Sequence, residues 1–264
     1  RKAPMILDAI VADKRTEVEA RKQALPREQL EERIAGLPAP RDFRGALRRE
    51  GISLIAEVKR KSPSKGDILP DMDVAHLATL YEQSGARAVS VLTDQKYFGG
   101  SLDDLVKVHT QTKLPCLRKE FIIDPYQIYE ARAAGAAAVL LIVRILTDAE
   151  LRAFRGVCKA LGLAALVETH TEDEILRALD SGASIIGINN RDLDTLEIDL
   201  GTTLRLKKRV SGGHTLVSES GIHNRRDVKM LEDGGVDAIL VGESILTSGN
   251  IRGKIQELLG HDQD

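Results

Sequence analysis

The sequence has few of the features that mark secreted, membrane or nucleic-acid-binding proteins. Only two cysteines, Cys116 and Cys158, occur in 264 residues, which is too few for a disulfide framework and is typical of a reducing compartment. No apolar run approaches the roughly 20 residues of a membrane helix. The net charge of -2 gives no electrostatic reason to expect a nucleic-acid partner. The first residues lack the apolar segment of a signal peptide, so we expect a cytoplasmic protein that binds neither membrane nor nucleic acid.

Aromatic residues are also scarce. Trp is absent, and Phe and Tyr occur four times each, so the core must be built mainly from Ile, Leu, Val and Ala. The hydrophobic content of 42% and the charged content of 30% are ordinary for a globular protein. No Pro-rich or Ser-rich linker divides the chain. We therefore predict a single domain over residues 1–264, because an α/β barrel typically needs about 250 residues.

Short apolar runs alternate with amphipathic segments along most of the chain. Strands are predicted at residues 54–58, 88–92, 114–117, 138–143, 164–167, 185–188, 215–217 and 238–241. Helices are predicted after them at residues 73–84, 101–111, 125–134, 147–161, 171–181, 200–210, 223–234 and 251–259. This alternation is typical of parallel strands covered by helices. Eight units favour a closed (β/α)8 TIM barrel over an open doubly wound sheet.

Two further patterns concern the ends of helices and the start of the chain. Glycine follows four of the predicted helices, at Gly85, Gly135, Gly182 and Gly235, where a left-handed residue ends a helix most easily. Before the first strand, apolar residues spaced among many charges predict amphipathic helices over residues 5–34 and a short helix before Ser53. The barrel therefore has a helical N-terminal extension.

Polar side chains follow nearly every predicted strand, at the end where barrel enzymes carry their active sites. Glu57 and Lys59 are two residues apart, so both project from the same face of an extended strand. Glu168 also follows an apolar run directly. Lys119 lies in the segment 114–123 (LPCLRKEFII), which has apolar residues on both sides of the charged run; we expect them to lower its pKa towards a range useful for acid catalysis. A single charge beyond a strand is more often a solvated loop residue. The prediction of an active site therefore depends on these residues taken together.

The last two units predict a phosphate-binding site. Residues 218–222 (SESGI) and 241–245 (VGESI) each place a glycine at a strand end before a helical segment, where backbone N–H groups can point at an oxyanion. Barrels frequently bind phosphate in this place. The histidines form no metal-binding pattern and no dinucleotide fingerprint follows the first strand, so we expect neither a metal nor a cofactor.

Six segments in this order resemble those of indole-3-glycerol-phosphate synthases. They are residues 55–66 (IAEVKRKSPSKG), 118–121 (RKEF), 140–143 (LLIV), 167–168 (VE), 187–192 (GINNRD) and 218–222 (SESGI). The resemblance implies a (β/α)8 enzyme of tryptophan biosynthesis, with residues 1–50 as a helical extension over the barrel mouth. It implies conversion of 1-(2-carboxyphenylamino)-1-deoxyribulose 5-phosphate to indole-3-glycerol phosphate, CO2 and water.

The resemblance also implies roles for individual residues. Lys119 matches the general acid of the family and Lys59 its second essential lysine; the other matched catalytic positions are Glu57, Glu168, Asn189 and Glu219. Matched substrate-binding positions are Ser62, Phe98, Phe121, Arg191, Ser220, Gly221 and Gly242, of which the two phenylalanines form apolar walls. Glu243 departs from the family, some of whose members have Ser there, so we expect its backbone N–H to make any phosphate contact, with the carboxylate turned away.

Three functional hypotheses are compatible with these residues. The synthase is the first. A Schiff-base aldolase is the second, because Lys59 or Lys119 beside a phosphorylated keto-sugar suits that chemistry too. A non-catalytic sugar-phosphate-binding barrel is the third, and the density of ionisable groups at strand ends disfavours it. In each case the partner is a small phosphorylated molecule, and we expect a monomer or a weak homo-oligomer.

Overall fold

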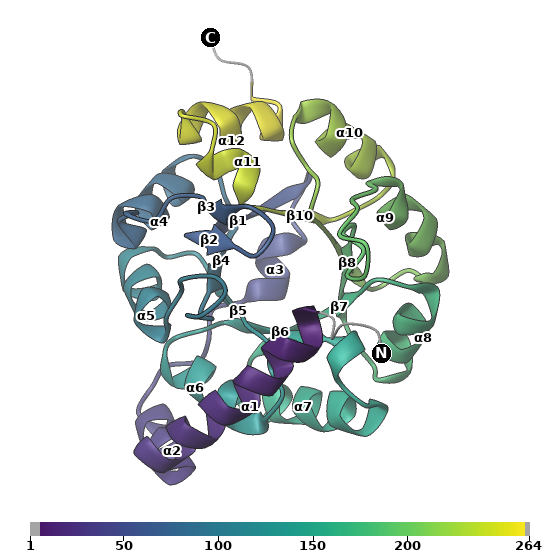
Figure 1. The fold of residues 1–264 in the computed structure, drawn as a ribbon. Coiled ribbons are helices and arrows are strands. Elements are labelled where there is room, and N and C mark those ends of the chain that lie inside the picture. The colour runs from purple at the N-terminus through teal and green to yellow at the C-terminus, as the bar shows by residue number, and fades with distance from the viewer. Residues whose placement is uncertain (1–5, 262–264) are drawn as a thin grey trace.

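A computed structural model describes residues 6–261. Within this range eight parallel strands close into a barrel (Figure 1), so the open doubly wound alternative is excluded. Around the barrel the strands are β1 (Ser53–Val58), β4 (Ala88–Leu92), β5 (Cys116–Lys119), β6 (Ala138–Ile142), β7 (Ala164–Thr169), β8 (Ile185–Asn189), β9 (Thr215–Glu219) and β10 (Ala238–Val241). The last strand pairs with the first, with Ala56 opposite Val241. A short antiparallel pair, β2 (Lys61–Ser62) and β3 (Gly66–Asp67), follows β1.

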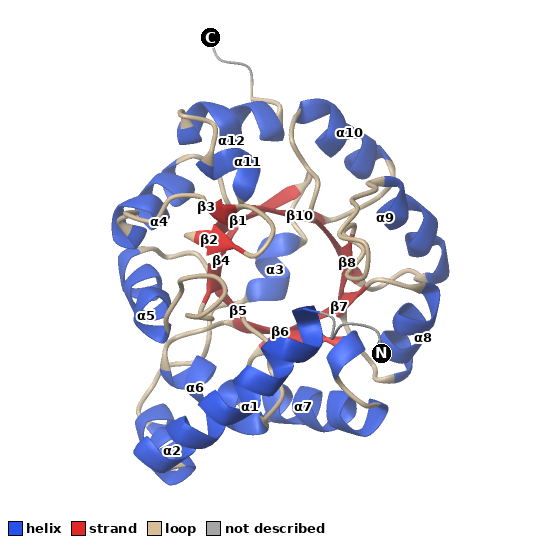
Figure 2. Ribbon diagram, in the orientation of Figure 1, coloured by secondary structure: helices blue, strands red, loops and turns tan. Residues whose placement is uncertain are grey.

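Helices surround the barrel on the outside (Figure 2). They are α4 (Val74–Gln83), α5 (Leu102–Gln111), α6 (Pro125–Ala133), α7 (Asp148–Ala160), α8 (Glu172–Asp180), α9 (Gly201–Leu206), α10 (Arg225–Asp233) and α12 (Ile251–Leu259). Short 3-10 turns η1 (Val143–Ile145) and η2 (Lys207–Arg209), and the additional helix α11 (Glu243–Leu246), complete this layer. The predicted sequence of strands and helices is confirmed, and α11 was not predicted because it spans a single turn.

Some predicted strand boundaries were wrong. The third strand, β5, begins at Cys116 and continues to Lys119, two residues later than predicted. β9 likewise runs to Glu219, whereas the prediction ended at Val217. Hydrophobicity does not mark these ends, because charged residues continue the hydrogen-bonded ladder while their side chains project into the barrel. In contrast, β6 ends at Ile142 because Val143 begins η1.

The predicted glycine positions at the ends of helices are confirmed. Gly85, Gly135, Gly182 and Gly235 have φ angles of 103°, 90°, 80° and 77°, in the left-handed region. Each lies just beyond a helix and leads into the next strand. These residues allow a tight αβ connection that a side chain with Cβ would strain.

Alternation along β1 directs residues to two different apolar cores. Leu54, Ala56 and Val58 pack in the shell between barrel and helices, whereas Ile55 packs inside the barrel. Because strand side chains alternate, Glu57 projects to the same side as Ile55. The strand therefore aims this carboxylate into the barrel.

The N-terminal segment contacts both ends of the barrel. It comprises α1 (Ile6–Ala24), α2 (Arg27–Ala35) and α3 (Phe43–Leu47). In Figure 1, α1 crosses the open end of the barrel. In contrast, α3 lies at the opposite end, where Phe43 and Leu47 join the interior core and Ser53 at the start of β1 donates a hydrogen bond to the Leu47 carbonyl. No helix in the described part of the chain is long and apolar enough to cross a membrane.

Candidate active site

A pocket of about 370 Å³ lies at the carboxyl ends of the strands, a size within the usual range for small-molecule sites. The structure brings every site residue predicted from the sequence into the lining of this one pocket. They are Glu57, Lys59, Ser62, Phe98, Lys119, Phe121, Glu168, Asn189, Arg191, Glu219, Ser220, Gly221, Gly242 and Glu243. Helix α1 adds Ile6, Leu7 and Ile10, which the sequence did not single out because they read as ordinary apolar positions of an amphipathic helix.

Two lysines share one buried carboxylate at one side of the pocket. Glu57 Oε1 lies 3.4 Å from Lys59 Nζ, and Glu57 Oε2 lies 3.8 Å from Lys119 Nζ. Ser90 on β4 donates a hydrogen bond of 3.0 Å to Glu57 Oε2. Burial raises the pKa of Glu57, but the two ammonium groups and Ser90 outweigh it and lower the pKa below its ordinary value. Glu57 is therefore ionised and fixed between the two lysines.

The predicted lowering of the Lys119 pKa was wrong. Burial does lower this pKa, but the carboxylates of Glu57, Glu168 and Glu219 outweigh it, and the pKa is raised above the ordinary lysine value. The apolar residues near Lys119 in the sequence, Leu117 and Phe121, lie two positions away on either side, whereas the carboxylates close to it in space come from β1, β7 and β9. Lys119 thus carries its proton at neutral pH, which suits a proton donor and disfavours a nucleophilic amine.

The two other carboxylates of the pocket differ from one another. Burial raises the pKa of Glu168, but Lys119 and His170 outweigh it and hold the pKa below its ordinary value. Burial and the neighbouring Glu168 carboxylate raise the pKa of Glu219 well above its ordinary value. Two close carboxylates do not both ionise readily in a buried site. Of the two carboxyl groups, Glu219 therefore holds a proton more readily than Glu168.

Aromatic and aliphatic side chains form the apolar part of the pocket. The rings of Phe98 and Phe121 lie with centroids 6.0 Å apart at an interplanar angle of 37°. Leu7 and Ile10 are buried and add aliphatic surface from α1. A flat aromatic group fits such a lining.

The end of the pocket near β9 and β10 offers backbone N–H groups. Ser220 and Gly221 have φ angles of 71° and 78°, and Gly242 precedes α11. A Cβ at Gly242 would lie 3.1 Å from both Cβ and Oε1 of Glu57, so a side chain at this position would crowd Glu57. The carboxylate of Glu243 lies 3.3 Å from Lys65 Nζ in the loop after β1. The Glu243 carboxylate is thus paired with another pocket residue, and the backbone N–H of Glu243 lies at the start of α11.

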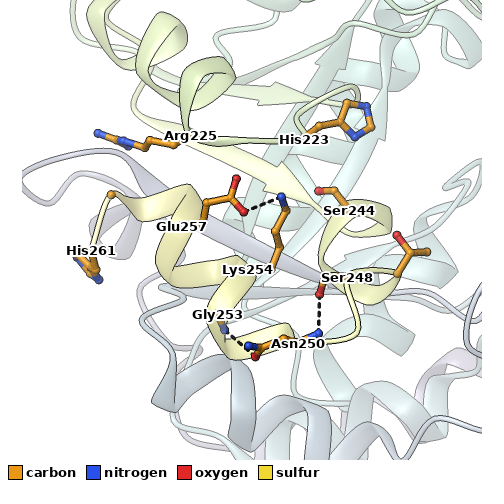
Figure 3. A pocket seen from close by; sticks show the side chains of 11 residues that line it. His223, Arg225, Ser244, Ser248, Asn250, Gly253, Lys254, Glu257 and His261 are labelled. Atoms are coloured by element: carbon orange, nitrogen blue, oxygen red, sulfur yellow. Dashed lines mark hydrogen bonds and ion pairs between the residues drawn. The ribbon is translucent and has the colours of Figure 1, made fainter. Parts of the chain in front are cut away.

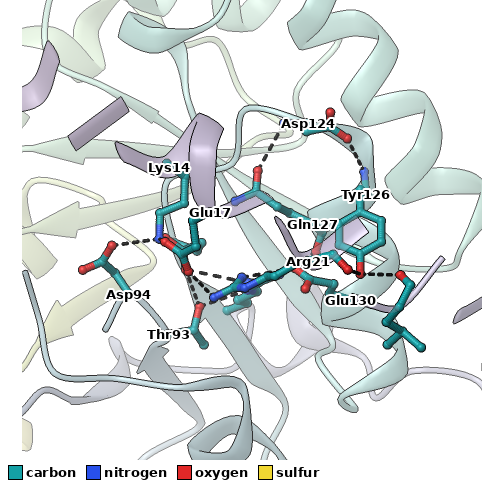
Figure 4. A network of polar contacts seen from close by, with 12 residues as sticks. Lys14, Glu17, Arg21, Thr93, Asp94, Asp124, Tyr126, Gln127 and Glu130 are labelled. Atoms are coloured by element: carbon teal, nitrogen blue, oxygen red, sulfur yellow. Dashed lines mark hydrogen bonds and ion pairs between the residues drawn. The ribbon is translucent and has the colours of Figure 1, made fainter. Parts of the chain in front are cut away.

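A buried charge network attaches α1 to the barrel beside the pocket (Figure 4). Lys14 Nζ lies 2.8 Å from Asp94 Oδ2 and 3.1 Å from Glu120 Oε1. Arg118, which is fully buried, lies 3.2 Å from Glu130 on α6 and 3.7 Å from Glu120. Sequence reasoning missed this network, because a lysine in a charged amphipathic helix normally faces solvent. Only the run of charges at 118–120 hinted at it.

A second, shallow cavity of about 780 Å³ lies between α12 and the loop before α10 (Figure 3). Its charged groups are largely paired: Lys254 contacts Glu257 at 2.8 Å, and Arg225 contacts Glu232 at 2.9 Å. No group of three or more His, Cys, Asp or Glu side chains suited to a metal occurs among the described residues. The second cavity thus lacks the buried, closely spaced carboxylates and lysines of the pocket at the strand ends.

Solved structures with a similar fold include other barrels. Thiamine phosphate pyrophosphorylase from Pyrococcus furiosus matches 80% of this chain and 95% of its own, with a TM-score of 0.60 and 16% identity. A mutant tryptophan synthase alpha-subunit from the same organism matches 79% of this chain and 98% of its own, with a TM-score of 0.58 and 15% identity. At such low identity the likeness supports the fold alone.

Sequence comparisons are more specific. The family model of indole-3-glycerol phosphate synthase matches residues 7–258. The indole-3-glycerol phosphate synthase of Acetivibrio thermocellus is 48% identical over 256 residues, covering 96% of this chain and 98% of that protein. The enzyme of the same name from Dehalococcoides mccartyi is 48% identical over 97% of this chain and all of its own length. The chain therefore belongs to the indole-3-glycerol phosphate synthase family.

Proposed function

We propose that the chain converts 1-(2-carboxyphenylamino)-1-deoxyribulose 5-phosphate into indole-3-glycerol phosphate, CO2 and water in tryptophan biosynthesis. The main support for this proposal is Lys119, because a protonated lysine held among Glu57, Glu168 and Glu219 can donate a proton to a carbonyl. The aromatic ring of the substrate fits beside Phe98 and Phe121. Its phosphate fits the N–H groups near β9 and β10.

Ring closure is the first step that the pocket supports. The ring carbon of the substrate attacks the ribulose carbonyl carbon, and Lys119 donates its proton to the carbonyl oxygen as that oxygen gains negative charge. The product of this step is a hydroxylated five-membered ring whose aromatic part is interrupted. Loss of CO2 then returns the electron pair of the broken C–C bond to the ring.

Water loss needs an acid and a base on the same intermediate. Lys59 donates a proton to the departing hydroxyl, and Glu57 accepts the proton lost from the substrate carbon. Because Glu57 lies 3.8 Å from Lys119, it can return that proton to Lys119 for the next turnover. Lys59 regains its proton from solvent, which balances the proton taken up when an ionised carboxyl group leaves as CO2.

The domain organisation, the oligomeric state and the location of the protein are part of the same proposal. We infer that residues 1–264 form one domain, because the described part of the N-terminal extension contacts both the pocket and the opposite end of the barrel. We also infer a cytoplasmic monomer or weak homo-oligomer, in keeping with its two free, buried cysteines. Size-exclusion chromatography with light scattering tests the oligomeric state, and a stable large assembly would contradict it.

A turnover assay with the carboxyphenylamino-deoxyribulose phosphate tests the reaction, with indole fluorescence as the signal. The absence of Trp keeps the protein background low. We expect fluorescence to rise with time; folded protein that leaves the authentic substrate unchanged would contradict the proposal.

Borohydride added during turnover distinguishes the aldolase alternative. A Schiff base would be reduced to a stable adduct at Lys59 or Lys119, whereas proton donation leaves the intact mass unchanged. We expect no adduct.

A further inference from the structure

His170 lies directly between a pocket carboxylate and a carboxylate on the outer helix layer. It follows the last residue of β7, and its Nε2 lies 3.4 Å from Glu168 Oε1. On the other side of the ring, Nδ1 lies 3.1 Å from Glu174 Oε2 in the first turn of α8. The backbone N–H of His170 donates to the same Glu174 oxygen at 2.7 Å. Both the ring and its backbone are thus fixed by Glu174.

The surroundings of His170 favour a charged imidazole. Its side chain is only 4% exposed, and burial by itself lowers its pKa. The contacts with Glu174 and Glu168 outweigh burial and the more distant Arg144 of η1, so the pKa is raised above its ordinary value. Among the described residues Nε2 makes no hydrogen bond, and its ionic contact is with Glu168. A positive ring there faces a negative carboxylate on either side.

We propose that His170 is a positioning residue that, held by Glu174, fixes the Glu168 carboxylate in its place in the pocket lining. This proposal rests on the proposed function, because the ionised Glu168 carboxylate is one of the groups that attract the Lys119 ammonium and hold it in place for proton donation. The arrangement carboxylate–imidazole–carboxylate connects the acid–base groups of the pocket to α8. Glu174 and His170 themselves lie outside the pocket lining, so neither is assigned a contact with substrate.

The consequence is a specific dependence of activity on pH. An opposite charge within about 4–6 Å lowers a carboxyl pKa by about 1–3 units. Replacing His170 by glutamine removes that charge, so the pKa of Glu168 rises. The fall of kcat/KM on the acid side of the pH profile then begins at a higher pH. A purely structural loss would lower activity by the same factor at every pH.

The experiment compares kcat/KM of the parent, His170→Gln and the control His76→Gln between about pH 5 and 8.5. His76 lies on α4, outside the pocket. Ionisation of the substrate affects all three proteins equally. The ratio of kcat/KM in a variant to kcat/KM in the parent therefore reports ionisation of groups on the enzyme alone. For His170→Gln we expect the ratio to fall steadily as the pH is lowered from 8 to 5, by at most about tenfold for each unit by which the Glu168 pKa rises. For His76→Gln we expect a constant ratio.

Glu174→Gln provides a second variant in case His170→Gln does not fold. It removes the partner that holds the imidazolium, so its ratio should fall in the same direction by a smaller factor. Histidine NMR with carbon-13 labelling gives a readout without activity: the His170 resonance should titrate above about 6.5, the ordinary value, and lower in Glu174→Gln. A ratio independent of pH in both variants, or a His170 that titrates below its ordinary value, overturns the proposal. An inactive parent would instead contradict the proposed function.

Discussion

Lys14→Met tests how α1 is held over the pocket. Lys14 is 1% exposed and its ammonium contacts Asp94, Glu120 and, at 2.7 Å, Glu17. Methionine keeps most of the side-chain volume but removes the charge. Asp94 then loses the one ion pair that the described residues give it, and retains the backbone N–H of Tyr97 at 2.7 Å.

The expected magnitude follows from the burial of the charges left behind. Removing one partner of a buried ion pair costs about 3–5 kcal/mol. Glu120 keeps hydrogen bonds from Thr93 and from the backbone of Phe121, both at 2.8 Å, so the lower half of that range is expected. With about 2–4 °C per kcal/mol for domains of this kind, the melting temperature should fall by on the order of 10 °C. KM should also rise, because α1 supplies Leu7 and Ile10 to the pocket.

The matched control is Lys22→Met on the same helix. Lys22 is 33% exposed and contacts Asp124 at 2.5 Å and Glu19 at 2.9 Å, so the loss should be below about 1 kcal/mol. Urea unfolding followed by circular dichroism at pH 7 measures both variants. If Lys14→Met loses no more stability than Lys22→Met, the network does not hold α1 to the barrel.

The sign of the pH dependence provides a further check on Lys14. Burial lowers its pKa, but Glu120, Asp94 and Glu17 outweigh it and raise the pKa above the ordinary lysine value. A raised pKa contributes stability that is fully present below the pKa of the unfolded chain and is lost as pH rises through that of the folded chain. The difference between parent and Lys14→Met should therefore stay constant from pH 6 to 9 in urea unfolding, and a difference that vanishes within this range would be inconsistent with the raised pKa.

Four other expected outcomes concern the proposed active site and the cysteines. Lys119→Met should lower kcat by at least about 10²-fold, the usual scale for a lost general acid, with a smaller change in KM; a variant with near-parental kcat would exclude Lys119 as the donor. Gly242→Asp should raise KM, since its side chain meets Glu57 and its charge repels phosphate, whereas Gly212→Asp, with nothing within 4 Å of its Cβ position, should not. Inorganic phosphate should compete with substrate in the parent, and a parent indifferent to phosphate would place the anion site elsewhere. Burial raises the pKa of both cysteines to about 12, so N-ethylmaleimide should modify neither in the native protein and both after unfolding, as intact mass will show.

The sequence by itself predicted the barrel and many of the residues that line the pocket, but not the contribution of α1. Strand alternation places Glu57 on the interior side with Ile55, and the glycines after four helices mark the αβ connections. Parallel strands bring their carboxyl ends to one side, so residues that follow different strands meet without any further information. Periodicity and turn chemistry depend on near neighbours in the chain, and these the sequence displays directly.

The ionisation of the site was decided only by the tertiary structure. Apolar neighbours in sequence predicted a lowered pKa for Lys119, whereas carboxylates from β1, β7 and β9 raise it. The ion pairs of Lys14 with Asp94 and Glu120 likewise join residues that are far apart in the chain. Coulomb energies and desolvation depend on distances in space and on access of water. Neither quantity is defined until the barrel has closed and α1 has covered its mouth.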